Sequence, residues 1–155
     1  MQLDRYPDFI AYLLGLNNVK IALHGLHHVH PGFLIPVEFQ NQDALECELI
    51  IKKSLTIFKE AKLKNPIGMC PPGWNLPIGL KKAITSLGLL YVASARDLIT
   101  PIKQDAVTNM SGEKNLSLIY PHWISDKNLL HIPTNFQATS KIKRAFEIIE
   151  AGGLL

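Results

Sequence analysis

The chain has 155 residues, of which 47% are hydrophobic and 19% are charged, and its formal net charge is +3. This composition excludes an intrinsically disordered chain, and no run of about 18 apolar residues is present that could span a membrane. The length predicts a single domain over residues 1–155 with a hydrophobic core. The 16 basic residues are dispersed and do not alternate with aromatic residues, so we expect no nucleic-acid partner.

The two cysteines, Cys47 and Cys70, are too few for a disulfide framework. The N-terminal residues lack a basic segment followed by an apolar one, which is the pattern of a signal peptide. We therefore expect a cytoplasmic protein that does not associate with a membrane.

Short apolar runs alternate with amphipathic segments along the chain, which predicts an α/β fold with a mainly parallel sheet. Asp43 and Glu46 favour the first turn of a long helix, whereas Asn75 and Gly88 are expected to begin and end the next one. In the last helix, Phe146 and Ile149 are expected to face the core. Helices are predicted over 7–15, 42–63, 75–87 and 140–151, and strands over 19–23, 66–70, 89–93, 116–120 and 129–132.

Four of the six histidines lie within seven residues, directly after the apolar strand that ends at Leu23. His24 and His28 are four residues apart, so a helical turn or a compact loop places both imidazoles on one side, about 6 Å apart. Neutral imidazole is a common zinc ligand, but a catalytic zinc requires three protein ligands. The pair therefore predicts part of a metal site, with His27 and His30 facing outward or supporting it. The alternative is a histidine-rich surface loop without a ligand.

A second motif, Pro71-Pro72-Gly73-Trp74, follows the next predicted strand. The two prolines hold the backbone extended, and Trp74 offers a flat apolar face that could stack on a sugar ring. The alternative is a stiff turn between a strand and a helix, with a tryptophan in the core.

The order of these motifs resembles the NodB-like polysaccharide deacetylases, and most closely their divergent predicted-deacetylase branch. The resemblance covers most of residues 17–95 and, weakly, residues 116–155. It implies a partial, distorted (β/α) barrel and a divalent metal, usually Zn2+, held by one Asp and two His, with His24 and His28 matching the His pair. It also implies that the metal site acts on an N-acetylated carbohydrate. Residues that match the expected substrate side of the site are Glu38 with its neighbour Phe39, Pro71, Pro72 and Trp74.

The chain departs from that family in three places. Cys70 stands where the better-known branch has an arginine before the two prolines. No Asp pair follows a strand within residues 1–18, and the family's final strand ending in a catalytic His has no counterpart before Leu155. His131 precedes the last predicted helix and is a weak substitute for that catalytic acid. We therefore expect an incomplete domain, a fragment with little activity of its own.

The sequence thus predicts a metal-dependent polysaccharide deacetylase-like hydrolase. The first alternative is a non-catalytic glycan-binding domain of the same fold. The second is a different metallohydrolase built from the histidines of residues 24–30 and a distant carboxylate such as Glu38. The third is an α/β domain whose histidine-rich loop binds nothing.

Overall fold

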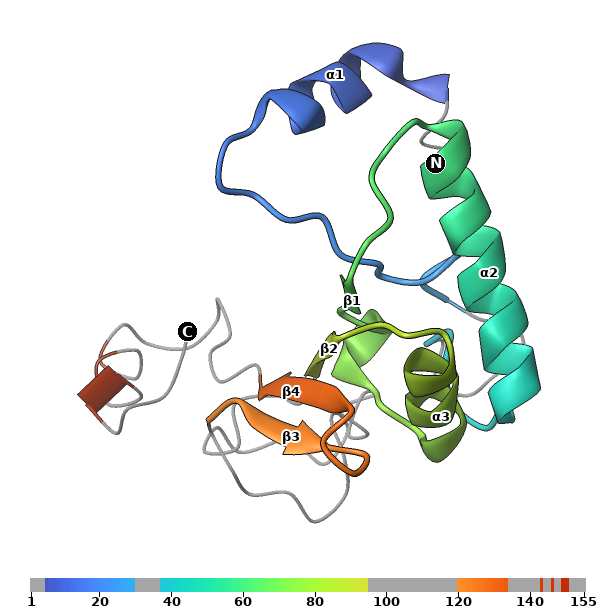
Figure 1. The fold of residues 1–155 in the computed structure, drawn as a ribbon, viewed down its shortest axis with the longest axis vertical. Helices are drawn as coiled ribbons and strands as arrows, with labels where there is room; N and C mark the ends of the chain where they lie inside the picture. The colour runs from blue at the N-terminus through green and yellow to red at the C-terminus, as the bar shows by residue number, and fades with distance from the viewer. Residues whose placement is uncertain are drawn as a thin grey trace.

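The computed structural model describes residues 5–29, 37–94 and 120–133, and positions 143, 146, 149 and 150. These residues form helices and a sheet, which confirms the α/β class (Figure 1). The elements in chain order are α1 (Pro7–Gly15), α2 (Ala44–Glu60), β1 (Gly68–Met69), the short 3-10 helix η2 (Pro72–Trp74), α3 (Ile78–Ser86), β2 (Tyr91–Ser94), β3 (His122–Ile124) and β4 (Leu129–Pro133).

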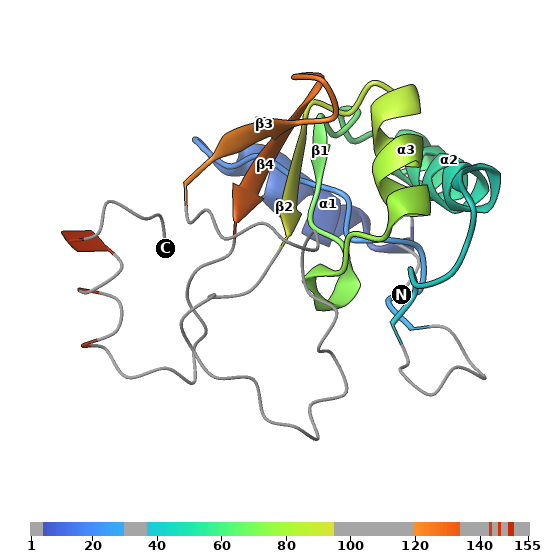
Figure 2. The ribbon, with the colours of Figure 1, turned by 90° about the horizontal axis from the view of Figure 1, so that it is seen from below.

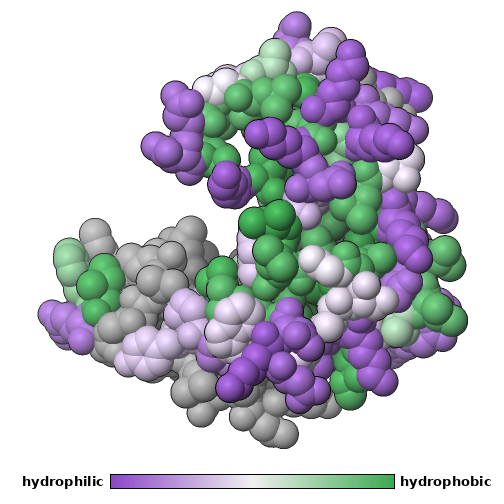
Figure 3. All heavy atoms as spheres, viewed as in Figure 1, coloured by the Kyte–Doolittle hydropathy of each residue, from purple (hydrophilic) through white to green (hydrophobic). Residues whose placement is uncertain are grey.

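Helix α1 has the bounds that the sequence predicts, and it lies apart from the sheet (Figure 1). Of its side chains, only Ile10 is buried, while Tyr12 is 62% exposed and its ring stacks with that of Phe9. The surface is hollowed between α1 and the sheet, and hydrophobic side chains show in this hollow (Figure 3). Helix α1 is therefore held to the rest of the molecule by little apolar contact.

Helix α2 begins at a capping box. The Asp43 carboxylate accepts a hydrogen bond from the backbone N–H of Glu46, and the Glu46 carboxylate accepts one from the backbone N–H of Asp43. Each side chain thus satisfies a backbone donor that a helix N-terminus leaves without an intrahelical partner. Cys47, Ile51 and Phe58 recur at helical spacing and form the buried apolar stripe of this helix.

Helix α3 buries Leu80, Ala83 and Ile84 and ends, as predicted, before Gly88, which has the positive φ of +72° that favours glycine. The prediction that Asn75 caps this helix is wrong, because the N-cap is Pro77. Asn75 is buried and its side-chain amide donates instead to the Phe39 carbonyl, 2.6 Å away.

The four strands form an open mixed sheet in the order β1-β2-β4-β3. Strands β1, β2 and β4 are parallel, and β3 pairs antiparallel with β4 at the edge. Leu23 adds a single parallel bridge to Met69 on the far side of β1. Met69 pairs with Val92, which in turn pairs with His131, so the parallel segments follow one another across the sheet in chain order.

Several predicted elements differ from the structure. The strand expected over 19–23 is reduced to the bridge at Leu23, and β3 was not predicted. The strand expected over 116–120 lies outside the described residues except for Tyr120, which belongs to no strand. Phe146 and Ile149 are 59% and 52% exposed, so the prediction that they face the core is wrong.

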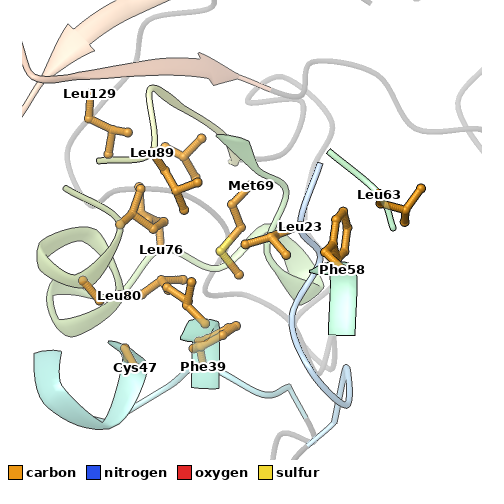
Figure 4. Close-up of a cluster of buried hydrophobic side chains, with 14 of the residues drawn as sticks. Leu23, Phe39, Cys47, Phe58, Leu63, Met69, Leu76, Leu80, Leu89 and Leu129 are labelled. Atoms are coloured by element: carbon orange, nitrogen blue, oxygen red, sulfur yellow. The ribbon is translucent and has the colours of Figure 1, made fainter. Parts of the chain in front are cut away.

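Helix α3 lies between the sheet and α2 (Figures 1 and 2). The core is formed where the sheet, α3 and α2 pack on one another. Figure 4 shows Met69 and Leu23 side by side near the centre of this cluster. Burial of such apolar side chains contributes roughly 1.5–3 kcal/mol each. No helix in the described part of the chain is long and apolar enough to cross a membrane.

Candidate functional site

The parallel arrangement brings the residues that follow Leu23 and Met69 to one edge of the sheet. Because Leu23 is bridged to Met69, the next residues, His24 and Cys70, lie beside each other at the carboxyl ends of their strands. This edge is where α/β proteins place their binding sites. The two motifs singled out in the sequence therefore meet at one place.

The His24 ring is fixed by a backbone contact. Its Nδ1 lies 2.6 Å from the carbonyl oxygen of Cys70. A carbonyl only accepts hydrogen bonds, so Nδ1 carries the proton and Nε2 presents its lone pair. Histidines that bind metals characteristically donate their other ring N–H to a carbonyl or a carboxylate in this way.

His28 lies next to His24, as the spacing of four residues predicts. The two ring centroids are 5.0 Å apart and the rings are tilted by 44°. Both side chains are exposed. His28 has a φ of +68°, and Gly25 has a φ of +134°, so a compact loop rather than a helical turn brings the rings together.

Glu38 lies behind this loop, and only 3% of it is exposed. One carboxylate oxygen accepts a hydrogen bond from the backbone N–H of Leu26 at 2.8 Å, and the other accepts one from His27 at 3.0 Å. Both oxygens are therefore directed at the protein backbone. The His27 side chain is exposed, as predicted, and His30 lies outside the described residues.

The Pro71-Pro72-Gly73-Trp74 turn packs against the same loop. A Cβ atom at Gly25 would lie 3.3 Å from Cγ of Pro72. Pro71 and Pro72 are buried, whereas Trp74 is half-buried and has a φ of +55° directly after Gly73 at +63°. The turn thus places Pro72 against the histidine loop, with Trp74 two residues further along the chain.

His24 and His28 are two imidazoles side by side, whereas a catalytic zinc requires three protein ligands. Among the described residues, no group of three or more His, Cys, Asp or Glu side chains could hold a metal ion. The chemistry of this pair fits a divalent ion as two of three protein ligands. The Cys70 thiol is held in its neutral form, because burial raises its pKa.

His131 lies elsewhere, in the middle of β4, and it is 1% exposed. Its Nε2 is 2.8 Å from Oγ of Ser94, and its Nδ1 is 3.2 Å from Nε2 of His122. No sequence motif indicates this cluster, because the pairing of β2, β3 and β4 alone brings the three residues together. His131 is thus part of a buried polar network.

Comparison with family models, curated protein sequences and solved structures finds no match to this chain. The contacts described above are therefore the basis for a functional proposal.

Proposed function

We propose a metal-dependent deacetylase-like hydrolase that acts on N-acetylated carbohydrates, with a partial (β/α) barrel of the NodB type. The barrel interpretation is supported by the order of the parallel segments. Leu23, β1, β2 and β4 lie side by side in the order in which the chain forms them, as strands of such barrels do. The antiparallel β3 is then an addition at one edge.

The observation that carries the metal proposal is the orientation of His24. Its Nδ1–H is bound to the Cys70 carbonyl, its Nε2 is left to coordinate, and the His28 ring is 5.0 Å away by centroids. Such an outer hydrogen bond fixes the ring and raises the basicity of the ligating nitrogen. We propose Zn2+ as the ion that His24 and His28 hold.

A divalent ion at such a site polarises an amide carbonyl and activates water for hydrolysis. In this proposal, His24 and His28 hold the ion through their imidazoles, and Trp74 forms a wall of the substrate pocket. Amide hydrolysis also requires a general base, and no carboxylate joins the histidine pair among the described residues. Two imidazoles without a third ligand therefore predict weak metal binding and little turnover.

The test is thermal unfolding with and without excess Zn2+, followed by circular dichroism. An ion present at about 100 times its Kd stabilises the native state by about 2.7 kcal/mol, which raises the melting temperature by roughly 5–10 °C. We expect His24→Ala and His28→Ala to abolish this increase. His27→Ala is the matched control and keeps it, because the His27 side chain is exposed and outside the pair. An increase that survives in His24→Ala would rule out the proposed ligands.

Trp74 is half-buried and lies two residues after Pro72, which packs against the loop, and this also supports the alternative of a glycan-binding domain without catalysis. The two functions differ in their response to a chelator. Binding of an N-acetylated chitooligosaccharide that is unchanged by EDTA but lost in Trp74→Ala would favour the glycan-binding domain. Binding that requires Zn2+ would favour the hydrolase.

A further inference from the structure

The carboxylate of Glu38 is buried without a cationic partner among the described residues. The ion pair within the described part of the chain joins Lys52 to Glu48, one turn apart on α2. Glu38 instead receives the backbone N–H groups of Leu26 and His27, one on each oxygen. Hydrogen bonds from N–H donors to an ionised acceptor contribute about 1.5–3 kcal/mol each, which offsets part of the cost of burying the charge.

Gly25 allows this carboxylate to approach the loop. A Cβ atom at position 25 would overlap Oε2 of Glu38 and would also contact Pro72. Its φ of +134° lies in a region of backbone conformation that residues other than glycine rarely adopt. The glycine between His24 and His28 is therefore required by the packing of Glu38 and Pro72 against its backbone.

The main chain of Glu38 closes the loop from the other end. Its N–H donates to the carbonyl of His28 at 3.1 Å, and its own carbonyl accepts from the Gln42 side chain at 2.6 Å. Glu38 thus contacts residues 26, 27 and 28 directly. These contacts fix the path of the backbone between the two histidines.

We infer that Glu38 is a positioning residue for the His24–His28 pair and does not itself contact carbohydrate. The inference rests on the proposed function in so far as the pair binds a metal. In this inference, Glu38 preorganises the loop before a metal binds. Without the carboxylate, the Leu26 and His27 amides donate their hydrogen bonds to water and the loop samples other conformations. The cost of ordering the loop then falls on metal binding and weakens it.

The test uses the whole chain and the variant Glu38→Gln, which keeps the shape of the side chain but turns a donor NH2 toward one of the two amides. Glu60→Gln is the matched control, since it makes the same chemical change at the exposed last residue of α2. The first readout, without metal, is hydrogen exchange at the Leu26 and His27 amides together with the nuclear Overhauser contact between the His24 and His28 rings. The second is the Kd and the absorption spectrum of bound Co2+.

We expect Glu38→Gln to speed exchange at the two amides by about tenfold or more and to weaken the ring contact. Exchange at the buried Val92 amide should not change, which shows that the fold is intact. The Kd for Co2+ should rise by about tenfold or more, with an altered spectrum, as when outer partners of metal ligands are removed. Glu60→Gln should match the wild type in every readout.

Unchanged exchange and an unchanged ring contact in Glu38→Gln would overturn the inference, whatever happens to Co2+. If the wild type binds no Co2+ while both metal-free readouts change, the proposed function fails and the positioning role stands. If Glu38→Gln does not fold, Gly25→Ala probes the same contact from the loop side. Where both variants fold, the double variant should bind Co2+ no more weakly than whichever single variant binds it more weakly. Additive increases in the Kd would contradict a shared contact.

Discussion

Oγ of Ser94 lies 2.8 Å from Nε2 of His131, although the two residues are 37 positions apart in the chain. Hydrogen bonds continue from His131 to His122 and on to the Tyr120 carbonyl, and the donor of each can be assigned. The Tyr120 carbonyl can only accept, so Nδ1 of His122 donates to it over 2.7 Å. With neutral rings, Nε2 of His122 then accepts from Nδ1 of His131, and Nε2 of His131 accepts from the Ser94 hydroxyl. One fixed arrangement of protons thus connects β2, β4 and β3.

This network is expected to stabilise the sheet, so His131→Ala should be costly. The substitution removes two hydrogen bonds and leaves a cavity in the middle of β4, for which we expect a loss of about 2–4 kcal/mol in the free energy of unfolding. Ser94→Ala removes one of those bonds and should cost about 1 kcal/mol. Urea unfolding measures both, with His27→Ala as the exposed control that should change by less than about 0.5 kcal/mol. A His131→Ala variant as stable as the control would show that the network does not support the sheet.

The capping box of α2 makes a second prediction. Asp43→Ala removes the acceptor for the Glu46 N–H, and we expect the free energy of unfolding to fall by about 1 kcal/mol. Asp43→Asn keeps an oxygen in the same place and should stay within about 0.5 kcal/mol of the wild type. Equal losses in the two variants would mean that the charge of Asp43, and not its hydrogen bond, stabilises the helix.

The helices could be predicted because their signals are local. Cys47, Ile51 and Phe58 are four and seven residues apart, which places them on one face of a helix whatever lies opposite, and Gly88 ends α3 by its own backbone preference. The lengths of the strands are less predictable: the one at Leu23 is reduced to a single bridge and β1 has two residues, whereas β4 spans five. Strand β3 has only three residues and its Trp123 is exposed, so no apolar run marks it in the sequence, and pairing with β4 makes it a strand.

In the candidate site, too, local features could be predicted from the sequence, whereas contacts between distant segments could not. The closeness of His24 and His28 follows from their spacing in the sequence, and the structure brings their rings together. The partner of His24 is a backbone carbonyl at Cys70, and no residue type encodes that contact. Glu38 was expected on the substrate side from a resemblance, whereas its two oxygens are directed at backbone amides of the loop. Such contacts depend on how distant segments pack, which one sequence does not specify.

Asn75 joins the turn after β1 to the segment before α2, and a third prediction concerns this link. Its buried Nδ2 donates to the Phe39 carbonyl at 2.6 Å. Asn75→Ala should cost about 1–3 kcal/mol, because that carbonyl loses its donor. Asn75→Asp should cost more at neutral pH, since it places an acceptor against another acceptor. The comparison is made by urea unfolding, and equal stability of the wild type and Asn75→Asp would exclude the hydrogen bond as a stabilising contact.

The thiol of Cys47 predicts a dependence of stability on alkaline pH. Its burial against α3 and the core, and then the nearby carboxylates of Glu46 and Asp43, raise its pKa from 9.0 to about 12. In the unfolded chain the thiol loses its proton near its ordinary pKa, whereas in the folded chain it keeps the proton. The folded state therefore binds more protons above about pH 9, and its stability must fall as the pH rises from there toward about 12.

The slope of this fall is about 1.4 kcal/mol per pH unit for a single proton. Urea unfolding of the wild type and of Cys47→Ala at about pH 8 and about pH 11 isolates the contribution of this thiol, since other groups, including the Cys70 thiol, titrate in both proteins. Cys47→Ala should be less stable at the lower pH, because it leaves a small cavity in the core. The difference between the two proteins should shrink or reverse at the higher pH. A difference in stability that is the same at both pH values would mean that the thiol ionises equally easily in the folded and unfolded states. The packing around Cys47 would then not shield its thiol from water.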